Sequence, residues 1–112
     1  MTEAYETIHV ERRGSADWLT LNRPDAMNTL DTQVVTELRD YFGGLAENPD
    51  VRVVVMRGAG RAFCAGLDIK AASGDMERPF GYGFGFQGYL AEVYIRMRRI
   101  PQPIISLVHG PA

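Results

Sequence analysis

The amino-acid sequence predicts an α/β fold in which a β-hairpin is followed by a helix and a buried strand. Three observations predict it. Residues 5–12 and 16–21 alternate apolar and polar side chains, residues 31–45 repeat apolar side chains every three or four positions, and residues 51–56 are almost continuously apolar. These patterns are typical of half-exposed strands, an amphipathic helix and a strand buried on both faces, respectively.

The hairpin is the first predicted element. Ile8 and Val10 alternate with polar neighbours, and the tripeptide Arg13-Gly14-Ser15 separates this run from a second one over residues 16–21. A glycine between two such runs is a turn signal, because it adopts the left-handed conformations that tight hairpins need. We therefore expect residues 5–12 and 16–21 to form two strands joined by a short turn.

A helix is predicted next, beginning after Asp31. An aspartate suits the N-cap position, because its carboxylate accepts a hydrogen bond from a free backbone N–H of the first turn. The polar residues Arg39, Asp40 and Glu47 are expected on a solvated face. The apolar positions of this helix are expected to pack in the core: Val34, Val35, Leu38, Phe42 and Leu45.

The buried strand runs from Val51 to Met56, and Gly58 and Gly60 end it. The order strand, helix, strand predicts a right-handed crossover, which pairs the flanking strands in parallel. A parallel sheet needs both faces covered, and only one strongly amphipathic helix is visible in the sequence. We therefore expect apolar surface that more chain or partner subunits would have to cover.

Residues 71–88 carry glycines that alternate with aromatic side chains, and no regular element is predicted for them. Two interpretations stay open: a wall over a bound group, or an ordinary surface loop. Helical spacing returns over Tyr89 to Arg99. The basic end of that helix complements the negative C-terminal end of the helix dipole, with a phosphate contact as the alternative.

Composition excludes several classes of protein. The chain has 112 residues, 46% of them hydrophobic, with a formal net charge of −2, and its isoelectric point is near 5.6. Neither value suits a nucleic-acid-binding protein, which would show a concentrated basic face. One cysteine and two histidines give no disulfide framework and no metal-ligand spacing. With no signal-peptide pattern and no stretch long enough to span a membrane, a cytoplasmic protein is expected.

The segment over residues 60–69 is the strongest functional signal. It follows the buried strand and has small residues at Ala62, Ala65 and Gly66. Backbone N–H groups in such a loop approach a ligand without obstruction by side chains, and they lie at the carboxyl end of a strand, where ligands of α/β sheets bind. The alternative is a tight strand-to-helix turn whose small residues permit close packing.

Three segments together resemble the enoyl-CoA hydratase/isomerase family, the crotonases. They are residues 21–30 (LNRPDAMNTL), 58–69 (GAGRAFCAGLDI) and 104–112 (IISLVHGPA), and the resemblance extends from about Tyr5 to the last residue. It implies that residues 1–112 form the N-terminal part of a single crotonase-like domain, with the ββα spiral fold of the family. The family's Gly-rich turn and catalytic glutamates would follow beyond Ala112.

The resemblance also implies an activity. It suggests an enoyl-CoA hydratase/isomerase that holds the enolate oxygen of an acyl-CoA thioester in a backbone oxyanion hole, with the Leu67 N–H as one donor. The 112 residues alone would be inactive. No separate cofactor is implied, because coenzyme A is part of the substrate. A homotrimer or a dimer of trimers is implied as the assembly. The implied substrate-binding residues are Asp25, Ala26, Met27, Ala65, Gly66, Leu67, Asp68, Ile69 and Lys70.

Alternatives remain open at this point. The chain as a whole is also compatible with a non-catalytic module of the same fold that binds acyl-CoA or serves in assembly. Asp68 is interpreted as a helix cap rather than a base, Cys64 as a packing residue, and His109 as a residue whose backbone matters at the end of the last strand. His9 is expected on the surface.

Overall fold

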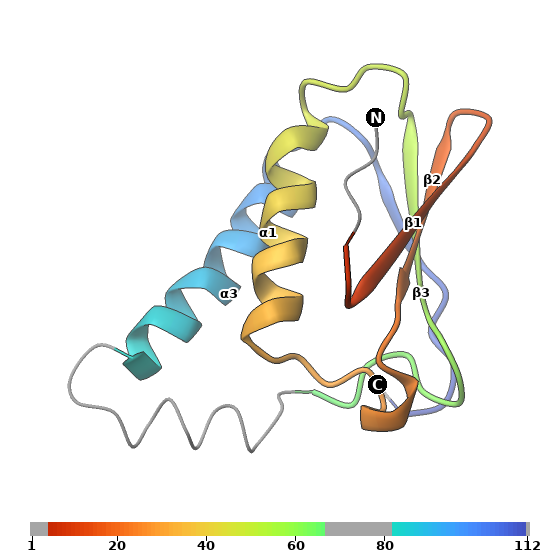
Figure 1. Ribbon diagram of the computed structural model, residues 1–112. Coiled ribbons are helices and arrows are strands. Elements are labelled where there is room, and N and C mark those ends of the chain that lie inside the picture. The colour runs from red at the N-terminus through yellow and green to blue at the C-terminus, as the bar shows by residue number, and fades with distance from the viewer. Residues whose placement is uncertain (1–4, 67–81, 112) are drawn as a thin grey trace.

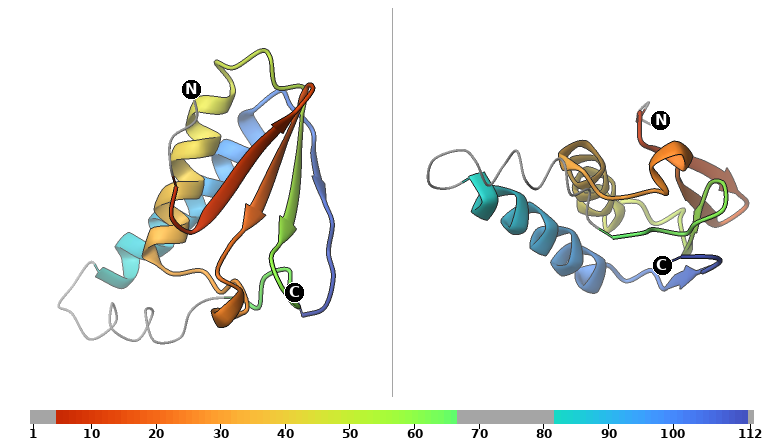
Figure 2. Two further views of the ribbon diagram at one scale, coloured as in Figure 1. Left: turned by 45° about the vertical axis from the view of Figure 1, so that its right-hand side comes forward. Right: turned by 90° about the horizontal axis from the view of Figure 1, so that it is seen from below.

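The computed structural model describes residues 5–66 and 82–111. Within these ranges the chain forms a four-stranded sheet with strand order β1-β2-β3-β4, and both helices lie on the same side of it (Figures 1 and 2). In chain order the elements are β1 (Ile8–Arg13), β2 (Ala16–Leu21), the 3₁₀ turn η1 (Pro24–Ala26), α1 (Thr32–Leu45), β3 (Val53–Gly58), α3 (Tyr82–Arg99) and β4 (Ile104–Ser106).

The predicted hairpin is confirmed. Strands β1 and β2 are antiparallel, with Arg13 paired to Ala16 around the turn, and Gly14 adopts a left-handed φ of 62°. Strands β2, β3 and β4 are parallel to one another, which agrees with the crossover predicted between β2 and β3. The carboxyl ends of these three strands therefore meet at one edge of the sheet.

Helix α1 is also confirmed, together with its cap. The Asp31 carboxylate accepts a hydrogen bond of 2.9 Å from the Val34 N–H, which satisfies one of the free donors of the first turn. All five predicted apolar positions are buried: Val34, Val35, Leu38, Phe42 and Leu45.

Strand β3 begins at Val53, two residues later than the pattern indicated, and Val51 is buried just before it. Val54 and Met56 belong to the core on the helix side of the sheet, and Val55, whose side chain points to the other face, is only 8% exposed. The prediction of a strand buried on both faces is therefore confirmed.

The prediction that no regular element lies before Gly88 is wrong for residues 82–88, because α3 begins at Tyr82. Glycine in a helix interior costs about 1 kcal/mol relative to alanine, which is why the glycines of this segment argued against a helix. Extending an existing helix costs much less free energy than nucleating one. The helix that packs from Leu90 onward therefore extends towards the N-terminus into the glycine-rich residues. Residues 71–81 lie outside the described ranges.

Polar side chains join the two helices. The Arg39 guanidinium lies 4.2 Å from the centre of the Tyr89 ring and 3.3 Å from the Glu92 carboxylate. Arg96 donates a hydrogen bond of 2.8 Å to the Arg39 carbonyl. Because Gly43 has no side chain, the Arg96 guanidinium fits against it. The prediction that Arg39 belongs to a solvated face is therefore wrong, and Arg96 binds a carbonyl of α1 rather than only complementing its own helix end.

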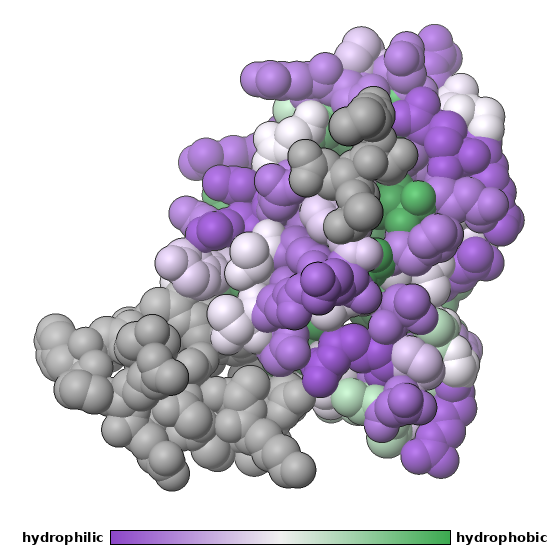
Figure 3. All heavy atoms as spheres, in the orientation of Figure 1, coloured by the Kyte–Doolittle hydropathy of each residue, from purple (hydrophilic) through white to green (hydrophobic). Residues whose placement is uncertain are grey.

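The surface is mixed. In the orientation of Figure 3, hydrophilic residues cover most of the described surface, and apolar residues show between them. Neither helix of the described chain has the length and apolar character that crossing a membrane requires. Several large apolar side chains are nevertheless exposed, all of them on α3 or in and after β4: Tyr89, Tyr94, Ile95, Ile105, Leu107 and Val108.

Candidate functional site

Three connecting segments meet at the carboxyl edge of the parallel strands. Residues 22–30 follow β2 and contain η1, residues 59–66 follow β3, and residues 107–111 follow β4 (Figure 1). The first two contain the described part of the predicted substrate-binding set. This edge is also where ligands bind in open α/β sheets, at the ends of neighbouring strands.

The segment after β2 is a tight turn. Pro24 stands at the start of η1, and the Asn28 N–H returns to the Arg23 carbonyl at 2.9 Å. Met27 and Asn28 both adopt left-handed conformations, with φ of 53° and 55°. Asp25 is consequently exposed at the tip of the turn. Ala26 and Met27 are half-buried against the rest of the site.

Backbone hydrogen bonds join this turn to the loop after β3. The Ala65 N–H donates to the Met27 carbonyl at 3.0 Å, and the Leu30 N–H donates to the Gly66 carbonyl at 2.8 Å. Gly66 has a φ of 103°, which side chains rarely tolerate. Predicted site residues from two segments almost forty positions apart are thus brought together.

Asn28 is the residue that sequence reasoning missed. It is only 2% exposed, and its Nδ2 donates to the carbonyls of Ala59 and Ala62, both at 2.9 Å. Its Oδ1 accepts a hydrogen bond of 2.7 Å from the Arg23 N–H. A signal was present in the sequence: asparagine is the residue besides glycine that best tolerates a left-handed turn, and this one lies between Met27 and Leu30.

The third segment closes the site from the side of β4. The Phe63 N–H lies 3.0 Å from the His109 carbonyl and 3.1 Å from the Pro111 carbonyl. The His109 ring nitrogen Nε2 is 2.8 Å from the Gly60 carbonyl. Strand β4 ends at Ser106, so the prediction that His109 lies at the end of the last strand is wrong. Its backbone carbonyl and its ring both contact the loop after β3. Gly110 is left-handed and packs directly on the Arg61 carbonyl.

Two further predictions near the site are confirmed. Cys64 is half-buried and packs against the hydrophobic core, with its sulfur 4.0 Å from the Gly66 carbonyl. His9 is exposed on β1. A thiol packed against the core in this way suits a structural cysteine better than a nucleophile.

Two arginines set the charge around the turn. Arg23 is engaged within it: its Nη1 donates to the Thr29 carbonyl at 2.6 Å and lies 3.6 Å from the Asp31 carboxylate. Arg61 is exposed, and its Nη2 is 3.8 Å from the sulfur of Met27. A positive charge therefore lies beside the predicted substrate-binding turn.

The remaining predicted site residues, Leu67, Asp68, Ile69 and Lys70, lie outside the described residues, and their assignments stay predictions. Residues 5–66 and 82–111 contain no cluster of three His, Cys, Asp or Glu side chains placed to hold a metal ion.

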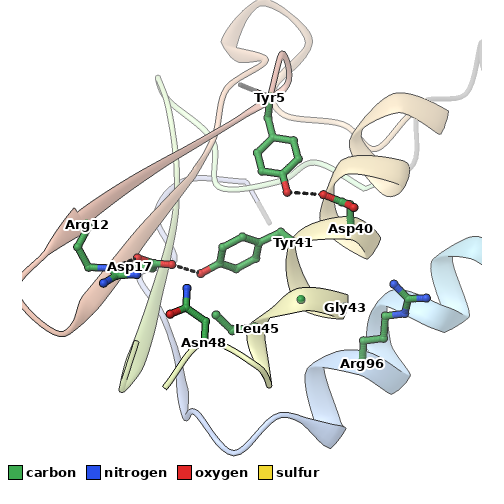
Figure 4. Close-up of a pocket in the computed structure, with 10 residues that line it drawn as sticks. Tyr5, Arg12, Asp17, Asp40, Tyr41, Gly43, Leu45, Asn48 and Arg96 are labelled. Atoms are coloured by element: carbon green, nitrogen blue, oxygen red, sulfur yellow. Dashed lines mark hydrogen bonds and ion pairs between the residues drawn. The ribbon is translucent and has the colours of Figure 1, made fainter. Parts of the chain in front are cut away.

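A cavity of about 570 Å³ lies at the opposite, amino-terminal edge of the parallel strands (Figure 4). Its polar side chains bind one another. Asp17 accepts hydrogen bonds of 2.7 Å from both Arg12 and Tyr41, and Tyr5 donates to Asp40 at 2.6 Å. The lining residues are Tyr5, Arg12, Asp17, Asp40, Tyr41, Gly43, Gly44, Leu45, Asn48 and Arg96.

Electrostatics in this cavity favour a structural role. Burial, together with the hydrogen bond to Asp17, raises the pKa of Tyr41, and the Asp17 carboxylate raises the pKa of Arg12. Each shift holds the group in its ordinary protonation state, whereas a catalytic acid or base needs a pKa near the working pH. Neither shifted group is therefore poised as an acid or base near neutral pH. We take the carboxyl edge as the candidate functional site because the described residues of the predicted substrate-binding set lie there.

Comparison with known proteins identifies the family of the chain. The model of the enoyl-CoA hydratase/isomerase family matches residues 11–112, a range that includes all three segments of the site. The chain belongs to the enoyl-CoA hydratase/isomerase family.

Two curated relatives illustrate the range of the similarity. Enoyl-CoA hydratase EchA19 of Mycobacterium tuberculosis is 37% identical over 106 residues, which cover 92% of this chain and 39% of that protein. The 3-hydroxyisobutyryl-CoA hydrolase 1 of Arabidopsis thaliana is 41% identical over 71 residues, covering 63% of this chain and 19% of that protein. The chain thus spans about two fifths of the length of the first relative and less of the second.

Solved structures show the same fold. Pseudomonas aeruginosa AtuE superposes with a TM-score of 0.90 at 30% identity, covering 95% of this chain and 41% of that one. An enoyl-CoA hydratase of Mycobacterium smegmatis gives 0.84 at 35% identity, covering 92% and 40%. The predicted crotonase-like α/β fold is confirmed, and the chain corresponds to part of it.

Proposed function

We propose that this chain binds acyl-CoA thioesters at the carboxyl edge of its sheet and contributes one backbone donor to an oxyanion hole, as part of an enoyl-CoA hydratase or isomerase. The observation that carries the proposal is the pair of hydrogen bonds joining Met27 to Ala65 and Leu30 to Gly66. They bring the two implied substrate-binding segments together, so that one ligand can contact both.

The substrate class is supported by the chemistry that the relatives' names share. One is a hydratase and the other a hydrolase, but each acts on a thioester of coenzyme A. The common demand of such reactions is stabilisation of negative charge on the thioester oxygen. We therefore propose a thioester of coenzyme A as the substrate class. The reaction depends on the acid and base groups placed around the thioester oxygen.

Each described site residue has a proposed role. The turn of Asp25, Ala26 and Met27 forms one wall of the coenzyme A groove. The Ala65 N–H is occupied by the Met27 carbonyl, so the Ala65 peptide offers a ligand its carbonyl rather than its N–H. Gly66 lets the backbone approach the thioester without side-chain obstruction.

Leu67 has the central chemical role in the proposal. Its N–H donates to the thioester oxygen as negative charge develops there. Asp68, Ile69 and Lys70 continue the substrate-binding segment, and no separate cofactor takes part. One donor gives half of an oxyanion hole, and loss of a single donor typically costs about 10²–10³ in rate. We infer that residues 1–112 alone bind the thioester without turning it over.

For the assembly we propose a homotrimer or a dimer of trimers in the cytoplasm. The exposed apolar side chains on α3 and after β4 support an assembly in which further protein covers them.

A substitution at Leu67 tests the proposal. Leu67→Pro removes the N–H, so bound crotonyl-CoA should lose the lowering of its carbonyl stretching frequency that a donor produces, as measured by isotope-edited infrared spectroscopy. In any form with measurable turnover, the rate should fall by about 10²–10³. Cys64→Ala is the control from the same loop and should keep the frequency shift. Equal spectra for both variants would contradict the role of Leu67.

A further inference from the structure

We propose that Asn28 is a positioning residue: it fixes the substrate-binding turn against the loop of residues 59–66, and the polarisation of a bound thioester depends on that arrangement. The inference rests on the proposed function. Asn28 is a polar residue that is almost fully buried, and its backbone is left-handed with a φ of 55°. A buried amide costs free energy unless its hydrogen bonds are made.

The hydrogen bonds of this amide span both segments. Both of its donors are used, one by the Ala59 carbonyl and one by the Ala62 carbonyl, and its oxygen accepts from the Arg23 N–H. The side chain therefore fixes the distance between the start of the turn and the middle of the loop. A shift of either segment by a fraction of an ångström would break at least one of these bonds.

Space for the amide is provided by Gly58. A Cβ at Gly58 would lie 2.8 Å from the Asn28 Nδ2 and would also overlap the carbonyl of Ala62. The end of β3, the loop and the turn are thus packed around one side chain. Such tight packing transmits displacement rather than absorbing it.

Two backbone hydrogen bonds connect the surroundings of Asn28 with the residues before Leu67. The sequence neighbours of Asn28, Met27 and Leu30, make the two backbone bonds to Ala65 and Gly66, the residues that immediately precede Leu67. Without the Asn28 amide, the turn loses the side-chain hydrogen bonds that hold its register against the loop. Displacement of a catalytic group by about 1 Å can cost about 10² in rate, so modest slippage suffices.

Asn28→Gly separates the side chain from the backbone conformation, because glycine adopts the left-handed φ without strain. The matched control is Gln102→Ala. Gln102 is also a buried amide, 7% exposed, and its Nε2 donates to two carbonyls, those of Leu45 and Asn48, far from the site. Both variants remove a buried amide and its hydrogen bonds to carbonyls. Gln102→Ala therefore shows how much of any effect comes from a general loss of stability.

The experiment records the carbonyl stretching frequency of carbon-13-labelled crotonyl-CoA at saturating protein, together with the dissociation constant for free coenzyme A. We expect the frequency shift in the wild type and in Gln102→Ala, and its loss in Asn28→Gly. A full shift in Asn28→Gly would overturn the positioning role alone. No shift in the wild type would overturn the proposed function, and this inference with it.

Asn28→Asp serves as a second variant if Asn28→Gly does not fold. Aspartate keeps the shape, the acceptor for Arg23 and the tolerance of left-handed φ, but its second oxygen faces the two loop carbonyls. The same loss of the frequency shift is expected. If both Asn28 variants fail to fold while Gln102→Ala folds, Asn28 is a stability residue and the positioning role is wrong.

Discussion

At the scale of single residues, the site depends on positions where a side chain would obstruct a backbone approach. Gly58 faces the carbonyls of Ala62 and Phe63 and the amide of Asn28, and Gly110 packs on the carbonyl of Arg61. The sequence predicted Gly58 only as the end of a strand. Its contacts depend on a side chain thirty positions earlier, and no local pattern reports such a distant neighbour.

Gly58→Ala should lower the free energy of unfolding by about 1–3 kcal/mol, because its Cβ would be forced into backbone carbonyls that cannot move aside. The measurement is urea unfolding followed by circular dichroism. Gly44→Ala is the control: a Cβ there meets nothing within 4 Å, and alanine favours the helix, so stability should rise by up to about 1 kcal/mol. A neutral Gly58→Ala would contradict the close packing described for the site.

At the scale of elements, most of the fold was predictable from local pattern. The hairpin, α1 with its Asp31 cap, and β3 all follow from periodicity and turn signals. The start of α3 was not predictable in the same way, because its glycines disfavour helix locally and the packing that supports the helix lies further along the chain. The bridge from Arg39 to Tyr89 was missed for a similar reason, since it joins residues fifty positions apart.

One contact between elements makes stability depend on pH. Burial opposes ionisation of Glu37 on α1, but hydrogen bonds from Thr7 and Glu6 outweigh it and hold the pKa of Glu37 below its usual range. A carboxylate with a lowered folded-state pKa contributes stability that is present above its unfolded-state pKa and is lost as pH falls through the folded-state pKa.

Glu37→Gln should therefore lower stability at neutral pH and weaken the decline between about pH 5 and pH 3, because the variant has no proton to gain there. Thermal unfolding measured across that range checks the prediction. Glu47→Gln, at an exposed carboxylate, is the control and should leave the pH profile close to that of the wild type. Parallel profiles for wild type and Glu37→Gln would show that the Glu37 contacts carry no linkage.

At the scale of the whole molecule, the sheet separates two regions with different chemistry. The carboxyl edge gathers backbone groups and small residues from three connecting segments, whereas the amino edge holds a cavity whose charged and phenolic side chains bind one another. The sequence predicted one part of the first region, because the loop over residues 60–69 follows a strand and ligands of α/β sheets bind at such ends. The turn of residues 25–27 was implied only by the family resemblance. The second region had no sequence signal, since Asp17 and Tyr41 belong to unrelated local patterns.

Every role proposed for a site residue depends on the binding of acyl-CoA at the carboxyl edge. The most direct test is a titration of the isotopically labelled protein with crotonyl-CoA, followed through its backbone amide resonances. The amide resonances of Ala26, Met27, Ala65 and Gly66 should shift, while those of Asp17 and Tyr41 at the other edge should stay in place. Shifts confined to the residues around the cavity, with none at the carboxyl edge, would contradict it.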